Sequence, residues 1–320
     1  MPGQSGAGNS AVVAVVQGNV PRERTLAEQA RVRGVAQNHA SETTLLAAAV
    51  RRGEVERPDI TLWPENSLDS DPTHDLALWA LVTDSVRVLD GPLLIGAILD
   101  GPDGKSYNAG QLWIPGQGPV ISYAKRQLVP FGEYIPARRL LGGLGSLQLI
   151  PRDFAPGTSQ APLTTGAIRL GDVICYEVAY DGLVRDAVRS GANLLVVQTN
   201  NATYERGLQA GQSEQQLAMA RIRAIEFGRS VALASTSGVS AIVAPDGRVI
   251  DRADTWRSAY LVERVPLADG HTLAERLGPW PEALLAALAL AGLVRRPGRR
   301  HRGATTPSVR DAPLARLGAG

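Results

Sequence analysis

The segment at residues 173–177 constrains the fold most, because it places a reactive side chain between two elements of different kinds. Residues 167–174 are rich in apolar and β-branched side chains and predict a strand, and residues 180–189 have the apolar spacing of a helix. Cys175, the only cysteine in the chain, lies at the turn between them. The N-terminus of the following helix is expected to favour a thiolate there. A lone cysteine can equally be a small buried apolar residue, so position alone does not identify a nucleophile.

The rest of the chain repeats this alternation of short apolar runs and longer helical runs. Residues 21–52, 76–88 and 212–227 have the spacing of helices. Strands that alternate with helices and hairpins indicate an α/β fold, with helices covering a mostly buried sheet. The predicted strands are residues 11–16, 59–63, 93–99, 107–114, 119–124, 192–197, 231–235, 240–244 and 249–250.

Charge and composition exclude several classes of function. The net charge is +2, but seven Arg and one Asp lie after residue 294, so the body before them is acidic and does not suit nucleic-acid binding. One cysteine excludes an internal disulfide, and the four histidines show no ligand spacing, so we predict no metal site and no cofactor. Residues 1–16 have no basic start and only a short apolar run, which predicts no signal peptide.

Three reactive side chains each follow a short predicted strand. They are Glu65, Lys125 and Cys175. Because the carboxyl ends of neighbouring parallel strands meet at one edge of a sheet, we expect the three to share a pocket.

The types of these residues favour nucleophilic catalysis. Lys125 is one of only two lysines among 33 basic side chains, and the other, Lys105, lies in a hairpin turn. A compact ammonium can stabilise a developing oxyanion in a way that arginine cannot replace, although a surface lysine is the alternative. Since no histidine ends a strand, Glu65 is the only plausible base for the thiol, unless it is a solvated turn residue.

The same residues, in this order, resemble those of the nitrilase (carbon–nitrogen hydrolase) superfamily, and more narrowly the apolipoprotein N-acyltransferase family. The stretch LVPFGEYIP at residues 128–136 distinguishes the narrower family from stand-alone nitrilases. The resemblance spans residues 11–294. The remaining matching segments are residues 16–20, 63–67, 174–177 and 219–226.

The resemblance implies a nitrilase-like α-β-β-α sandwich with a short C-terminal hydrophobic helix, and a two-step acyl transfer. Cys175 would take an acyl chain from a phospholipid as a thioester, and the N-terminal amine of a diacylglyceryl-cysteine lipoprotein would accept it. The partners are then the phospholipid donor, the lipoprotein acceptor and a membrane surface, with the catalytic domain on the extracytoplasmic face of a bacterial cell membrane. The alternative is a soluble amidase or nitrile hydrolase that uses the same triad with water as the acceptor.

The resemblance also assigns roles within the site. Glu65 would be the base and Lys125 the oxyanion donor, with the main-chain N–H of Tyr176 as a second donor. Glu133 and Glu177 match positions that support the pocket, although unaided either would be read as an ion-pair partner. The matching substrate-binding positions are Trp63, Asn200 and Tyr204, where residues 200–204 read Asn-Asn-Ala-Thr-Tyr in place of the Asn-Asp-Ala-Trp-Phe of many members.

The domain organisation follows from these assignments. We expect a flexible N-terminus at residues 1–10, a catalytic domain at 11–276, a hydrophobic membrane-associated helix at 277–294 and a basic disordered tail at 295–320. The family normally begins with several transmembrane helices, and none is expected ahead of the catalytic part here. Twelve uninterrupted apolar residues in the predicted helix are fewer than the roughly 20 that span a bilayer, so a buried or interfacial helix is the alternative. The glycine-rich run at 140–147 suits a loop that enters lipid or an apolar cover over the core.

Overall fold

The structure is a computed structural model that describes residues 9–21, 28–138, 153–202 and 211–294. The chain divides into two compact units, Met1–Gly278 and Pro279–Gly320, which are described separately. The predicted loop at 140–147 and the predicted basic tail lie outside the described residues.

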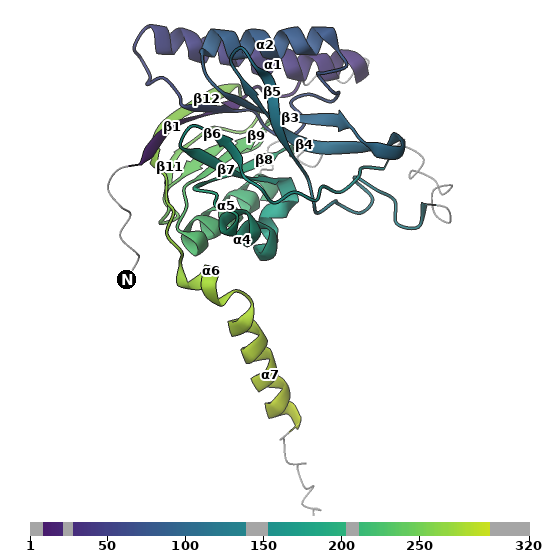
Figure 1. Cartoon of the computed structure of the whole chain (residues 1–320), viewed down its shortest axis with the longest axis vertical. Coiled ribbons are helices and arrows are strands. Elements are labelled where there is room, and N and C mark those ends of the chain that lie inside the picture. The colour runs from purple at the N-terminus through teal and green to yellow at the C-terminus, as the bar shows by residue number, and fades with distance from the viewer. Residues whose placement is uncertain (1–8, 22–27, 139–152, 203–210, 295–320) are drawn as a thin grey trace, which may run out of the picture. The chain divides into compact units, whose positions relative to one another are not determined.

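Two six-stranded sheets stack face to face in the first unit (Figure 1). The first has the order β12 (Ala259–Pro266), β1 (Ser10–Gln17), β2 (Ile60–Leu62), β3 (Leu93–Asp100), β4 (Ser106–Ile114) and β5 (Gly118–Ala124). The second has the order β11 (Val249–Arg252), β10 (Ala241–Val243), β9 (Val231–Ser235), β8 (Leu194–Thr199), β7 (Ile168–Ile174) and β6 (Leu163–Thr165).

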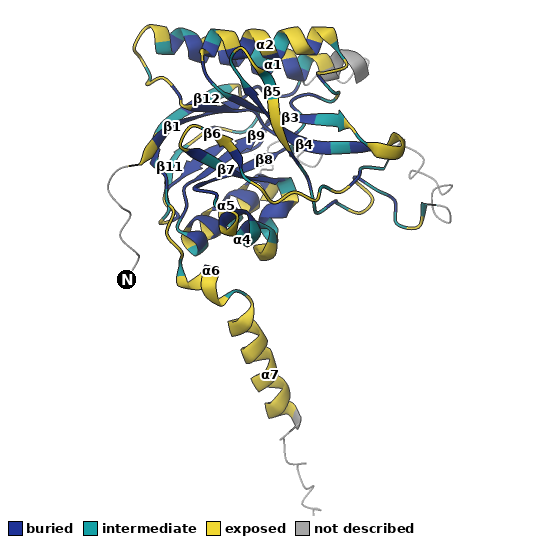
Figure 2. Ribbon diagram, in the orientation of Figure 1, coloured by how far each residue is buried: buried dark blue, intermediate teal, exposed yellow. Residues whose placement is uncertain are grey.

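Helices cover the outer face of each sheet. The helices α1 (Glu28–Arg51) and α2 (Leu76–Leu89) pack on the first sheet, and α4 (Asp181–Arg189) and α5 (Gly211–Phe227) pack on the second (Figure 1). Apolar side chains fill all three interfaces, which appear as dark blue strands and inner helix faces in Figure 2. The predicted α-β-β-α sandwich is therefore confirmed.

Strand direction explains why the reactive residues meet. The neighbours β1, β2 and β3 are parallel, as are β7, β8 and β9, so their carboxyl ends share an edge. The strand β5 runs antiparallel to β4, which is antiparallel to β3, so β5 ends at the same edge as β2. The residues that follow β2, β5, β7 and β8 therefore converge.

Several elements differ from those predicted. The strands β6 and β12 and the short helix α6 (Leu273–Leu277) were not anticipated. In β12 the charged pair Glu263 and Arg264 interrupts the apolar pattern, because this strand lies at the edge of its sheet. Between β7 and α4 the chain forms a 3-10 turn, η3 (Cys175–Ala179), in place of a direct entry into the helix. A further short 3-10 turn, η1 (Pro102–Gly104), makes the predicted hairpin turn.

The second unit contains the helix α7 (Trp280–Val294). Its only charged residue is Glu282, in the first turn, so by itself it presents apolar side chains on every face. Within the described part of the chain, no helix has both the length and the apolar character required to cross a bilayer.

Candidate active site

The side chains of Glu65, Lys125 and Glu133 form a buried charged cluster at the shared edge of the two sheets. Lys125 Nζ lies 3.3 Å from Glu65 Oε1 and 3.0 Å from Glu133 Oε1. Cys175 follows β7 directly opposite, and the charges of Glu65 and Lys125 both act on its thiol. The structure thus brings together the three residues that the strand ends predict.

Glu65 is held by hydrogen bonds to both carboxylate oxygens. Asn108 Nδ2 donates to Oε1 at 2.7 Å, and the Asn200 main-chain N–H donates to Oε2 at 2.8 Å. The same Asn108 amide group donates to Glu133 Oε1 at 2.8 Å, so it spaces the two carboxylates on either side of the ammonium. These contacts fix the orientation of Glu65 before any substrate arrives.

Lys125 is almost completely buried yet remains an ammonium. Burial on its own would lower the pKa of Lys125, but the Glu65 and Glu133 carboxylates outweigh it and hold the pKa above its ordinary value. Glu133 is fixed in turn by the Val129 N–H, which donates to its Oε2 at 2.8 Å. A fixed, dehydrated cation of this kind suits the stabilisation of an oxyanion.

Cys175 has an unusual main chain and an unusual thiol. Its φ is +55°, a left-handed conformation that a non-glycine residue adopts only where its surroundings enforce it. Thr199 Oγ1 lies 3.5 Å from Sγ and Gln216 Nε2 lies 3.6 Å from it. Burial and the Glu65 carboxylate raise the pKa of Cys175 to about 12, against the opposing effect of Lys125.

The resting nucleophile is therefore a thiol, and the expectation of a thiolate favoured by a helix N-terminus is wrong. The helix α4 begins only at Asp181, six residues after Cys175. Cys175 is itself the first residue of the η3 turn, which is too short to supply the dipole of a full helix.

Glu177 connects the turn that carries Cys175 to the segment that follows Lys125. Its Oε1 accepts from the N–H groups of Arg126 (2.7 Å) and Gln127 (2.9 Å). Its Oε2 accepts from the Ile174 N–H (2.8 Å) and the Tyr123 hydroxyl (2.9 Å). Burial raises the pKa of Glu177 above its ordinary value, and the four donors offset only part of that rise. Glu177 thus fixes the nucleophile and the lysine relative to each other.

Comparison with known proteins agrees with this geometry. Residues 12–275 match the family model described as carbon-nitrogen hydrolase. The chain belongs to the carbon–nitrogen hydrolase family. Two solved structures of an amidase of the nitrilase superfamily from Nesterenkonia AN1 are similar to it. A cysteine-to-alanine variant has a TM-score of 0.58 at 20% identity and covers 86% of this chain and 97% of its own. A glutamate variant with acetamide added at its active-site cysteine has a TM-score of 0.59 at 20% identity, over 88% and 99% of the chains. At this identity the likeness shows the fold alone.

Curated relatives are more similar to the chain in sequence. The apolipoprotein N-acyltransferase of Mycolicibacterium smegmatis is 37% identical over 91% of this chain and 50% of its own length. That of Gloeobacter violaceus is 34% identical over 92% of this chain and 55% of its own. The chain therefore spans about half the length of the curated relatives that it matches.

The other predicted site residues lie in different surroundings. Tyr176 is 50% exposed and packs edge-on against Tyr180. The Asn200 side chain accepts from Thr236 Oγ1 and the Ala202 N–H, so it serves the local loop. Tyr204 lies outside the described residues.

Trp63 does not line the site, which corrects its assignment to substrate binding. Its indole is completely buried between the first sheet and α1, where Nε1 donates to Thr43 Oγ1 at 2.9 Å. Its contribution is through the main-chain carbonyl, which accepts from Gln198 Nε2. Alternation along β2 places Leu62 between the sheets and Trp63 under the helices.

Several polar residues of the site were not predicted from the sequence. Asn108 lies within a hairpin strand, and Gln216 lies on the buried face of α5. Only Thr199 carried a usable signal, because it ends β8 as the reactive residues end their strands.

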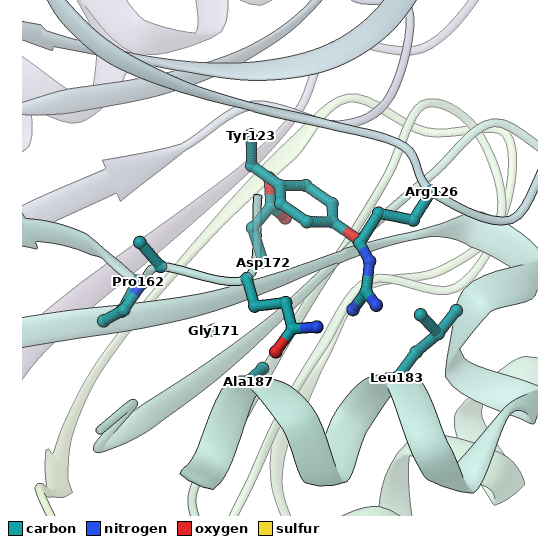
Figure 3. Close-up of a pocket in the computed structure, with 9 residues that line it drawn as sticks. Tyr123, Arg126, Pro162, Gly171, Asp172, Leu183 and Ala187 are labelled. Atoms are coloured by element: carbon teal, nitrogen blue, oxygen red, sulfur yellow. The ribbon is translucent and has the colours of Figure 1, made fainter. Parts of the chain in front are cut away.

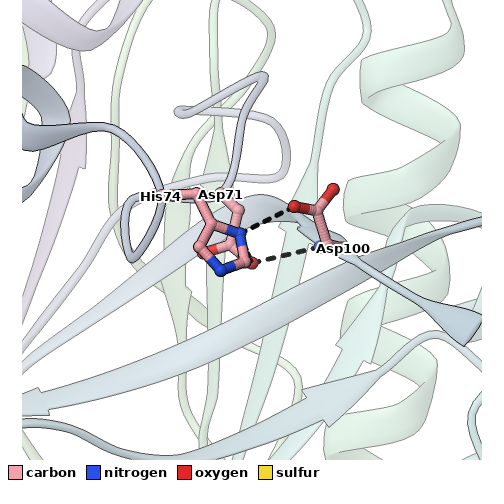
Figure 4. A group of neighbouring side chains, drawn as sticks. All are labelled: Asp71, His74 and Asp100. Atoms are coloured by element: carbon pink, nitrogen blue, oxygen red, sulfur yellow. Dashed lines mark hydrogen bonds and ion pairs between the residues drawn. The ribbon is translucent and has the colours of Figure 1, made fainter.

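A separate cluster joins Asp71, His74 and Asp100 on the surface (Figure 4). His74 Nδ1 lies 2.7 Å from Asp100 Oδ2, and Asp71 accepts from the Asp100 N–H at 3.1 Å. Within the described ranges it is the one group of three whose ligand atoms, all within 4.8 Å of one another, could hold a metal ion. The contacts within this cluster hold the loop that carries Asp71 and His74 against the end of β3. The prediction of no metal site stays a prediction.

Proposed function

We propose that this chain is the catalytic part of an apolipoprotein N-acyltransferase. It would move an acyl chain from a phospholipid, through a thioester on Cys175, to the N-terminal amine of a diacylglyceryl-cysteine lipoprotein. The observation that carries the proposal is the buried cluster of Glu65, Lys125 and Glu133 beside the only cysteine, in a chain that is similar to curated enzymes of this name over nine-tenths of its length.

The first step forms the thioester. Glu65 takes the proton of the Cys175 thiol as the sulfur attacks the carbonyl carbon of the phospholipid ester. The carbonyl oxygen becomes an oxyanion that Lys125 stabilises, with the Tyr176 main-chain N–H as a second donor. When the tetrahedral intermediate collapses, the C–O bond breaks and Glu65 returns the proton to the departing lysophospholipid alkoxide.

The second step releases the acyl chain. The neutral α-amine of the lipoprotein attacks the thioester carbon, and Glu65 accepts the proton that the amine loses. Lys125 again stabilises the oxyanion, and collapse breaks the C–S bond. The proton passes to the departing sulfur, which restores the thiol that is the resting form at neutral pH.

An amide hydrolase is the second candidate, because the solved amidases share the fold. The two functions differ in the donor, which is a phospholipid ester in one and an amide in the other, and in the acceptor, which is an amine in one and water in the other. A phospholipid donor places the reaction at a membrane surface, and we assign the catalytic domain to the extracytoplasmic face of a bacterial cell membrane. The apolar helix α7 suits such a surface.

Intact-mass spectrometry of the full chain after incubation with phospholipid vesicles tests the proposal. We expect a mass increase of one acyl chain that is absent in Cys175→Ala, and its loss when a diacylated lipopeptide is added, with the acyl chain recovered on the lipopeptide amine. Recovery of free fatty acid with an unmodified lipopeptide would favour the hydrolase. No adduct under any of these conditions would reject the acyltransferase.

A further inference from the structure

Asp172 is a buried acid that the mechanism does not use. It lies on β7, three residues before Cys175, with 4% of its surface exposed. Its neighbours Leu170 and Ile174, two positions away on either side, belong to the layer between the sheets, so Asp172 points into that layer. Neither of its carboxyl oxygens has a hydrogen-bond partner among the described residues. An ionised carboxylate in such a position carries a high desolvation cost.

A second unpartnered acceptor lies beside it. Gln198, on β8, is fully buried, and its Oε1 has no donor within the described chain. A Cβ atom built on Gly110, in the facing sheet, would overlap Asp172 Oδ2 and lie 2.6 Å from Gln198 Oε1. The two oxygens therefore border the same small space, which the absence of a side chain at Gly110 leaves open.

The orientation of the Gln198 amide is set from its other end. Its Nε2 donates to the Trp63 carbonyl at 2.6 Å. Exchanging the amide oxygen and nitrogen would place an oxygen against that carbonyl, so Oε1 must face Asp172. Two acceptor oxygens that border one space, with no donor to either among the described residues, are compatible only if one of them carries a proton.

The charged groups around Asp172 agree with a neutral acid. Burial, together with the Glu177 and Glu65 carboxylates, raises the pKa of Asp172 well above its ordinary value. Tyr123 and Arg126 line a cavity of about 10 Å³ beside Asp172, large enough for about one water (Figure 3). The Tyr123 hydroxyl donates to Glu177 and the Arg126 guanidinium pairs with Asp186, so these donors are directed elsewhere.

We propose that Asp172 is a protonated carboxylic acid that donates to Gln198 Oε1, and that through Gln198 it is a positioning residue for the base Glu65. The chain of contacts runs from Asp172 to the Gln198 amide and then to the Trp63 carbonyl, two residues before Glu65. On the other side of this segment, Gly96 approaches so closely that a Cβ atom there would overlap the Pro64 carbonyl oxygen.

The main chain that carries Glu65 is therefore clamped between two strands. Gln198 on β8 holds this main chain by donating to the Trp63 carbonyl, and the N–H of Asn200, which follows β8, holds the Glu65 side chain by donating to its Oε2. Losing the proton of Asp172 would place a carboxylate against Gln198 Oε1 and rotate the amide, and the Trp63 carbonyl would lose its donor.

The test compares Asp172→Asn, which keeps a donor of the same shape, with Asp172→Leu, which keeps the volume only. This inference rests on the proposed acyl transfer, so acylation by a soluble aryl ester is measured together with alkylation of Cys175 by iodoacetamide, which needs no acyl donor. We expect Asn to stay close to the wild-type acylation rate and Leu to lose about 10- to 100-fold, the size of a small misplacement of a catalytic group.

Two further readouts separate positioning from loss of stability. In Asp172→Leu we expect the Glu65 carboxylate to be displaced, so that it raises the pKa of the Cys175 thiol less than in the wild type. The pH profile of alkylation should then shift to lower pH, while the rate of acylation falls. The destabilising control Leu170→Ala, on the same face of β7, should lower the melting temperature and leave the profile unchanged. Adding Asp172→Leu to Gln198→Met should cause no further loss of acylation, because both act through one amide.

The infrared spectrum at neutral pH reports the proton directly. The C=O stretch of a protonated carboxylic acid should be present in the wild-type chain and absent in Asp172→Asn. An Asn variant as slow as the Leu variant, or a wild-type spectrum without this band, would overturn the assignment. If no variant, wild type included, is acylated while the alkylation profiles differ as expected, the proposed acyl transfer fails and the positioning role stands.

Discussion

Replacing Glu65 by Gln is expected to make the Cys175 thiol easier to ionise and yet much slower to acylate. The Glu65 carboxylate is one of the two causes that raise the pKa of Cys175 to about 12, the other being burial. A neutral amide of the same shape removes the like charge but cannot accept the proton during attack. Equilibrium ionisation and catalytic deprotonation therefore change in opposite directions.

The magnitudes follow from the surroundings of the thiol. A pKa of about 12 in place of the ordinary 9.0 corresponds to roughly 4 kcal/mol against the thiolate. Removing a neighbouring carboxylate lowers such a pKa by about 1 to 3 pH units, and Lys125 then acts on the sulfur with less opposition. Loss of a general base costs about 10²- to 10⁴-fold in the acylation rate.

The single cysteine makes the measurement direct, because thiolate absorbance and iodoacetamide alkylation against pH both report one sulfur. Glu54→Gln, which removes an exposed carboxylate from the turn after α1, is the matched control and should reproduce the wild-type titration. A wild-type thiol that titrates below pH 8, or a Glu65→Gln thiol that titrates higher than wild type, would refute this account of the site.

Three further predictions concern other parts of the chain. Lys125→Arg should keep the charge and lose at least about 100-fold in acylation, and near-wild-type rates would make Lys125 a simple structural charge. Burial lowers the pKa of His39 to about 4, so the unfolded chain binds its proton first and the free energy of unfolding should fall by up to about 3 kcal/mol between pH 6.5 and pH 4. Chemical denaturation of His39→Leu should show a flatter dependence over that range, and an unchanged slope would contradict the assignment. Ending the chain at Gly278 should leave acylation by a soluble ester intact and should weaken co-sedimentation with anionic vesicles. A lowered melting temperature with undiminished vesicle binding would instead mean that α7 stabilises the first unit and does not bind lipid.

The convergence of Glu65, Lys125 and Cys175 could be predicted because all three follow strands, although Lys125 follows the antiparallel strand β5 and Cys175 belongs to the second sheet. Each follows a short apolar run, and parallel strands share their carboxyl edge. The contributions of Asp172 and Gln198 could not be predicted in the same way. Alternation along a strand shows that two residues share a face, but not which residue of the other sheet they meet.

The state of Cys175 was predicted wrongly because a turn and a helix entry look alike in sequence. Cys175 is the first of the five residues of the 3-10 turn that precedes α4, and burial beside Glu65 dominates its pKa. Trp63 was misplaced for a different reason, since its assignment to substrate binding came from the resemblance and not from the pattern of the strand. The strand β2 ends at Leu62, and the indole of Trp63 is buried under α1.

The pairing of the first strand with the last has a consequence for how the protein is made. The strand β12 pairs with β1 along its whole length, from Ser10 opposite Pro266 to Gln17 opposite Ala259. The sheet that positions Glu65 and Lys125 is therefore completed only after every strand of the other sheet has been synthesised, and such distant contacts form slowly. A nascent chain halted before residue 259 would contain all three reactive residues and still lack the strand that closes the sheet holding two of them.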